Sequence, residues 1–105
     1  MTTNRLDRFF SDYSEPVAPG VTAVTSDTAD GYIVMWVKAD NPGIGAVSAW
    51  LDTLPRNRRI VFIGPGGRLV GMLERRGFKP CHVLSPGTDR WVDAHVRRPH
   101  RTERP

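Results

Sequence analysis

The sequence has very little cysteine and no long apolar run. Cys81 is the only cysteine among 105 residues, so a disulfide within the chain is excluded and a reducing compartment is the default. The longest apolar stretches, residues 32–37 and 60–63, are far shorter than the roughly 20 residues that cross a bilayer. Residues 1–5 lead into charge rather than into an apolar segment, so we expect no signal peptide. These features predict a cytoplasmic protein with no membrane contact.

Metal-binding and nucleophilic motifs are also missing. The three histidines, His82, His95 and His100, are scattered, whereas a structural zinc site needs four converging ligands. Cys81 and His82 are adjacent on an expected strand, where neighbouring side chains point to opposite faces. The sequence therefore predicts no metal and identifies no catalytic residue.

The length and charge of the chain limit the number of domains and the kinds of partner that it can have. A chain of 105 residues forms one compact domain, and its small core would be helped by a protein partner or by homo-oligomerisation. The net charge of +4 and the pI of about 10.0 suit an anionic partner, such as nucleic acid, the phosphates of coenzyme A or an acidic protein surface.

Apolar periodicity predicts an α/β (α+β) fold with a mixed sheet of about five to six strands, two core helices and a short N-terminal helix. Strands are expected at residues 21–25, 31–38, 60–63, 80–84 and 90–96, and helices at residues 3–13, 41–54 and 68–76. Asn41 is the expected N-cap of the second helix, with Pro42 in its first turn and Ile44 on its apolar face. Residues 14–20, which hold two prolines, are expected to form a loop.

The two ends of the chain differ in character. The N-terminal helix carries an apolar stripe that must pack on something, formed by Leu6, Phe9, Phe10 and Tyr13. Residues 97–105 are polar and lack apolar periodicity, which predicts a basic C-terminal tail after a single domain at residues 1–96. The arginines of that tail, Arg97, Arg98, Arg101 and Arg104, are candidates for contact with nucleic acid.

The order of motifs from residue 32 onward resembles the GNAT family of N-acetyltransferases. An apolar strand leads into the turn Asn41-Pro-Gly-Ile-Gly-Ala, and a second strand and helix end in Gly77-Phe78. The resemblance covers residues 32–78, or 32–96 with the final hairpin, and implies a GNAT-like mixed sheet. It also implies an acetyl-CoA site along the first strand and at the glycine turn, formed by Met35, Trp36, Val37, Lys38, Gly43, Ile44, Gly45 and Ala46.

Several positions depart from the family pattern. The leading Gln or Arg of the glycine motif falls on Asp40, whose charge would repel a pyrophosphate, and Pro42 removes one N–H group from the turn. The tyrosine that protonates the CoA thiolate falls on Leu73, which carries no proton to give. The N-terminal half, which forms much of the acceptor wall in the family, is also short. A general base would be Glu74, Asp30 or Asp27, and nothing singles one out.

These departures favour a non-catalytic GNAT-like binding or assembly module, encoded by a phage or a bacterium, and placed in the cytoplasm or, for a phage protein, in the virion. Such a module would need no cofactor. The first alternative is an acetyl-CoA-dependent N-acetyltransferase. The second is a basic nucleic-acid-binding protein, with Arg56, Arg58, Arg59, Arg75 and Arg76 adding to the tail.

Overall fold

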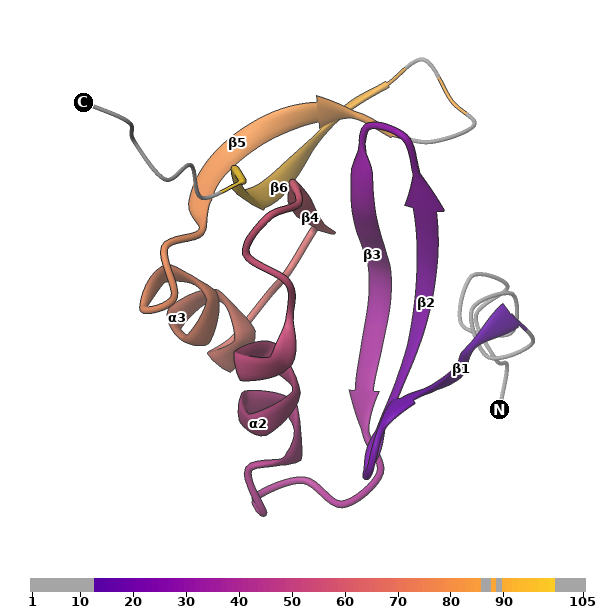
Figure 1. Cartoon of the computed structure of the whole chain (residues 1–105), viewed down its shortest axis with the longest axis vertical. Helices are drawn as coiled ribbons and strands as arrows, with labels where there is room; N and C mark the ends of the chain where they lie inside the picture. Colours follow the sequence, from indigo (N-terminus) through magenta and orange to yellow (C-terminus); the bar gives the residue numbers. More distant parts are fainter. Residues whose placement is uncertain (1–12, 86–87, 89, 100–105) are drawn as a thin grey trace, which may run out of the picture.

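The computed structural model describes residues 13–85, 88 and 90–99, which form a mixed sheet with two helices (Figure 1). The predicted α+β class is therefore confirmed. The strands are β1 (Glu15–Ala18), β2 (Val21–Thr28), β3 (Gly31–Ala39), β4 (Ile60–Ile63), β5 (Lys79–Leu84) and β6 (Trp91–Arg97), and the helices are α2 (Ala46–Thr53) and α3 (Arg68–Glu74). In the described part of the chain, no helix has the length and apolarity that a membrane crossing requires.

The sheet contains six strands in the order β1-β2-β3-β4-β6-β5. The only parallel pair in this described sheet is β3 with β4, and α2 forms the crossover between these two strands. Strand β6 returns between β4 and β5, antiparallel to both. β3 therefore lies inside the sheet, as its continuous apolar sequence predicts.

Strand β1 was not expected, because Pro16 and Pro19 predict a loop at residues 14–20. Glu15 lies opposite Ala23 and Ala18 opposite Val21, with an irregular register between Pro16 and Ala18. β1 is the first strand in the sheet order, and an edge strand tolerates a proline because one side of its backbone needs no partner. The predicted helix at residues 3–13 lies outside the described residues except for Tyr13.

Helix α2 begins later than its sequence predicts. Gly45, not Asn41, is its N-cap, with φ 80°, and the first helical hydrogen bond runs from the Ala49 N–H to the Gly45 carbonyl at 3.0 Å. A left-handed residue at this position separates the turn from the helix, and glycine adopts it without steric cost. Ile44 consequently precedes the helix and is 68% exposed, so its predicted place on the buried face is wrong.

Both helices cover the same side of the sheet (Figure 1). The core joins the sheet residues Val34, Ile60 and Phe62 to Trp50 and Leu51 of α2 and to Leu73 and Phe78. The Phe62 ring meets Trp50 and Phe78 edge-on, at centroid distances of 5.9 and 5.4 Å. Edge-to-face contacts of this kind add stability beyond that of the buried area alone.

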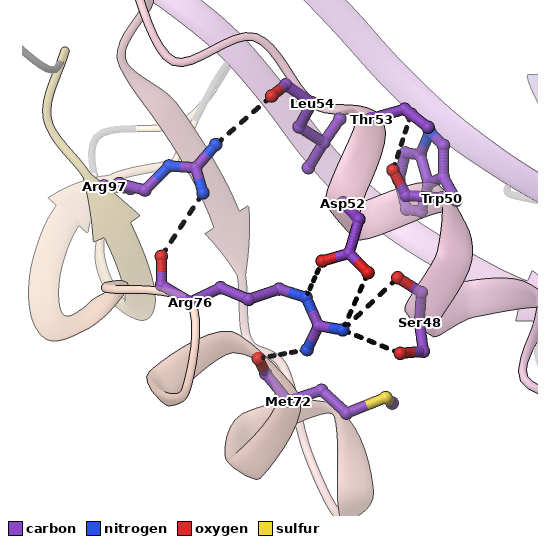
Figure 2. Close-up of polar contacts among 8 residues, drawn as sticks. All are labelled: Ser48, Trp50, Asp52, Thr53, Leu54, Met72, Arg76 and Arg97. Carbon is purple, nitrogen blue, oxygen red and sulfur yellow. Dashed lines mark hydrogen bonds and ion pairs between the residues drawn. The ribbon is translucent and has the colours of Figure 1, made fainter.

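Arg76 ties the two helices together (Figure 2). Its Nε donates to Asp52 Oδ1 at 2.8 Å, and its terminal nitrogens donate to the Ser48 hydroxyl and the Met72 carbonyl. This hydrogen bond with Arg76 lowers the pKa of Asp52 below its usual value.

Arg97 is the last residue of β6 and is only 8% exposed, so it does not begin a free tail. Its guanidinium donates to the carbonyls of Leu54 and Arg76 (Figure 2). It also donates to the Pro55 carbonyl and lies 4.8 Å from the Phe78 ring centroid. The prediction that Arg97 contacts nucleic acid is therefore corrected: its charge is used inside the fold, at the ends of α2 and α3.

Candidate functional site

The candidate site begins where β3 and β4 separate. The parallel register covers three pairs only, and Val34 opposite Phe62 is the last of them. β3 continues to Ala39, whereas β4 ends one residue later at Ile63. The pairing of β3 with β4 therefore ends before Met35.

A β-bulge marks the same point on the other side of β3. Val24 of β2 lies opposite Trp36 and the next residue, Thr25, lies opposite Val34, so Met35 is an extra residue. A bulge redirects the strand and increases its twist, and bulges are frequent beside binding sites. The bulge and the strand separation thus coincide at Met35.

A wedge-shaped cavity of about 320 Å³ fills the space between the separated strands. Residues 34–37 form one wall and residues 62–66 form the other. Its remaining lining comes from the helices, through Val47, Leu69 and Met72. This lining is mainly apolar, which suits an extended ligand whose polar groups pair with the backbone.

A second hollow of about 590 Å³ adjoins the wedge and contains the glycine turn. Gly43 and Gly45 lie on one side, and Arg68 and Arg75 of the α3 segment lie on the other. The first N–H groups of a helix lack intrahelical acceptors, so the start of α2 offers donors here. The two cavities share Val47 and Met72 in their linings, so they lie side by side and together form the groove.

Most of the predicted cofactor residues line this groove. Three of them line the wedge (Met35, Trp36 and Val37) and three line the hollow (Gly43, Gly45 and Ala46). Lys38 and Ile44 line neither cavity. Lys38 lies opposite Thr22 of β2 and is exposed.

Sequence reasoning missed the contribution of α3. Arg68, Met72 and Arg75 line the hollow and are spaced i, i+4 and i+7, which places them on one helical face. That spacing is visible in the sequence. The sequence alone does not show that this helical face lies against the glycine turn and not against solvent.

Asp40 does not line the groove, although its position in the sequence predicts a charge that would repel a pyrophosphate there. The Thr22 hydroxyl donates to Asp40 Oδ1 at 3.1 Å, and the Asp40 N–H donates to the Gly20 carbonyl at 2.9 Å. Both contacts hold Asp40 against β2 and the β1–β2 turn. Its carboxylate is absent from the residues lining either cavity.

Leu73, at the position of the family's tyrosine, is fully buried in the core. Its side chain therefore lies away from the groove as well as being unable to donate a proton. The neighbouring residues Leu69 and Met72 line the wedge instead.

Two of the three candidate bases already have partners. Asp27 Oδ1 lies 2.6 Å from Arg58 Nη1, and Glu74 Oε2 lies 3.1 Å from His95 Nε2. Asp30 is exposed in the β2–β3 turn, away from the residues that line the groove.

A third hollow of about 420 Å³ adjoins the wedge at Pro65. It contains His95 and a contact between His82 Nε2 and Asp93 Oδ1 at 2.9 Å, and both of these side chains are exposed. Histidine–carboxylate pairs are typical proton acceptors, so this hollow holds the groups closest in kind to acid–base machinery. Within residues 13–85, 88 and 90–99, no three potential ligands gather as a metal site.

Comparisons with known proteins add no assignment: no protein-family model, no curated protein and no solved structure matches the chain.

Proposed function

We propose that this chain is a GNAT-like binding module that holds a coenzyme A thioester in the groove without transferring its acyl group. The observation that carries the proposal is the separation of β3 from β4 after Val34 and Phe62, at the bulge that contains Met35. The sequence resemblance to GNAT proteins supports the proposal, because it implies an acetyl-CoA site along this strand and at the glycine turn.

The stretch of β3 that extends beyond its pairing with β4 suits the pantetheine arm. That arm is an extended chain with two amide groups, and extended amide chains bind strands at a sheet edge through backbone hydrogen bonds. In the wedge, residues 35–37 of this stretch lie next to an apolar wall formed by Phe62 and Leu69. Both the amide groups and the methylene groups of the arm thus have suitable partners.

The hollow suits the diphosphate. Phosphates bind at helix N-termini because the N–H groups and the helix dipole favour negative charge. Arg68 and Arg75 add two cations on the facing wall, and no acidic residue appears among those that line the hollow. With Asp40 held by Thr22, the charge in the hollow favours an anion.

Because Leu73 cannot donate a proton, the chain can bind a CoA thioester without transferring its acyl group. The departing CoA thiolate needs a proton, and the residue at the family's position is buried and apolar. A module that binds the ligand without turnover would present the ligand to a protein partner. Alternatively, the bound ligand would stabilise the module in the form that the partner binds.

Isothermal titration calorimetry with CoA and acetyl-CoA tests the proposal. We expect saturable binding, weakened about tenfold or more by the double variant Arg68→Glu/Arg75→Glu. The matched control is Arg56→Glu/Arg90→Glu, which changes the net charge equally at exposed residues outside the groove. No heat at near-millimolar ligand, or an equal loss in both variants, would contradict the proposal.

The second candidate function is an acetyl-CoA-dependent N-acetyltransferase, which the His82–Asp93 and His95–Glu74 pairs beside Pro65 favour. Either pair would accept the proton of an amine that enters through the third hollow. Release of free CoA thiol in the presence of a mixture of amines measures this activity. We expect none above background; release that is lost in both His82→Gln and Glu74→Gln would favour the enzyme instead.

A further inference from the structure

A cationic groove lies apart from the CoA groove, beside the end of β6. It has a volume of about 410 Å³ and shares no lining residue with the wedge or the hollow at the glycine turn. Three of its lining residues are cations, namely Arg59, Lys79 and Arg98, and none of the described lining residues is acidic. The rest of the lining is small or apolar: Gly77, Pro80, Cys81 and Val96.

The sheet register explains why these cations meet. Ile60 pairs with Arg97, so one step further along the same antiparallel register brings Arg59 opposite Arg98. Lys79 pairs with Val96, which lies two residues before Arg98 and therefore on the same face of β6. Arg97, between them, points to the other face, where it is buried. Three cations from three strands thus line one face.

Three other arginines in the described part of the chain use their side chains within the fold. Arg58 is paired with Asp27, Arg76 with Asp52, and Arg97 with backbone carbonyls. By contrast, the side chains of Arg59, Lys79 and Arg98 form no hydrogen bond or ion pair with any described residue. Like charges on neighbouring strands repel each other, so this arrangement becomes favourable when an anion lies among them.

We propose that this groove binds the phosphate backbone of a nucleic acid, independently of base sequence. A protein partner would need an apolar, aromatic-rich centre, which this lining lacks. A phosphate backbone needs only cations spaced along its path. The lining has no aromatic ring for stacking and no carboxamide for reading base edges, so it contributes backbone contacts alone.

Further cations follow Arg98 in the sequence. Arg101 and Arg104 follow Arg98 within six residues, and the chain as a whole carries a net charge of +4. Arg97 and Arg98 are adjacent but have different roles, since Arg97 is buried in the fold and Arg98 lines the groove. Only the residue whose side chain faces the groove takes part in binding.

Fluorescence anisotropy with a labelled oligothymidine of about 20 nucleotides tests the proposal. At about 50 mM salt the wild-type chain binds, and Lys79→Gln/Arg98→Gln weakens binding about tenfold and reduces the salt slope by about 1 to 1.5, as expected for two lost phosphate contacts. The charge-matched control Arg56→Gln/Arg90→Gln stays within about twofold of wild type. The charge-conserving variant Lys79→Arg/Arg98→Lys retains binding.

The groove variant keeps its binding of CoA, measured by calorimetry on the same sample, which shows that it is folded and separates this proposal from the preceding one. Three results overturn the proposal. The first is no binding at low salt. The second is an equal loss in the groove variant and its control, which assigns binding to net charge. The third is displacement of the oligonucleotide by polyglutamate as effectively as by unlabelled DNA of equal charge, which indicates an acidic protein partner.

Discussion

Val34 lies opposite Phe62 in the last pair that joins β3 to β4, and beyond this pair the two strands diverge. Both side chains are buried in the core, with exposures of 1% for each. The divergence point is therefore held by core packing on α2 and α3. Ligand binding at the wedge should consequently need little rearrangement of the backbone.

Val47 lines both the wedge and the hollow, so a larger side chain there should interrupt the groove. We expect Val47→Phe to weaken CoA binding about tenfold or more, because the ligand must pass this residue to reach both cavities. Calorimetry measures the effect. The matched control is Ala49→Phe, an exposed position of α2 that lines neither cavity. Unchanged affinity in Val47→Phe would place the ligand elsewhere.

Removal of the Arg97 guanidinium should destabilise the fold. Arg97→Ala leaves the carbonyls of Leu54, Pro55 and Arg76 without this donor and removes the contact with the Phe78 ring. We expect a loss of about 2–4 kcal/mol in the free energy of unfolding, measured by urea denaturation. Arg98→Ala, at the exposed next position, should change it by less than about 0.5 kcal/mol. Similar losses in the two variants would disagree with a buried Arg97.

Asp52 should make the stability of the fold depend on pH. The pKa of Asp52 is lowered from its usual 3.8 in the folded state, chiefly by its hydrogen bond with Arg76. The stabilisation is therefore complete above the unfolded-state pKa and is lost as the pH falls through the lower folded-state pKa. We expect the melting temperature of Asp52→Asn to lie below that of wild type at neutral pH.

The difference should shrink as the pH falls below about 4, because the wild-type carboxyl then also loses its charge. Thermal unfolding across this range measures the convergence. Asp30→Asn, at the exposed turn, serves as the control and should run parallel to wild type. A difference for Asp52→Asn that is constant with pH would mean that the ion pair with Arg76 contributes nothing.

Gly31 should not accept a side chain. Its φ is 148°, and a Cβ atom there would lie 2.6 Å from the Arg59 carbonyl oxygen, a backbone atom that cannot rotate away. We expect Gly31→Ala to cost about 2 kcal/mol or more, or a melting temperature lowered by about 8 °C or more. Gly66→Ala, where a Cβ would meet nothing within 4 Å, should be nearly neutral by comparison. A neutral Gly31→Ala would show that β3 and β4 approach less closely.

Much of the fold could be predicted from the local sequence. The apolar run of β4 (Ile60–Ile63) matches its prediction at both ends. Gly77, with φ 89°, lies in the turn that follows α3, where the Phe78 N–H donates to the Leu73 carbonyl at 3.1 Å. These features depend on residues a few positions apart, whose preferences act before distant segments meet. The beginning of α2 was misplaced because Asn41 and Pro42 are good helix-start residues, while the left-handed Gly45 overrides them.

The site was only partly accessible. The glycine turn and residues 35–37 were predicted from the resemblance, but the contribution of Arg68 and Arg75 depends on how α3 faces α2. Likewise, Asp40 looked unfavourable in sequence until Thr22, eighteen residues earlier, was found to hold its carboxylate. Side-chain partners of this kind are set by strand pairing, which single-residue propensities do not specify.

Sequence alone thus determined the strands β2 to β6 and the presence of both core helices, but not β1, because periodicity and glycine positions are local properties of the chain. The tertiary structure decided three further things: that β3 parts from β4 at Met35, that Arg97 is buried while Arg98 faces a groove, and that Arg59 and Lys79 join Arg98. The physical reason is strand register, since moving one residue along a strand exchanges the buried face for the exposed one.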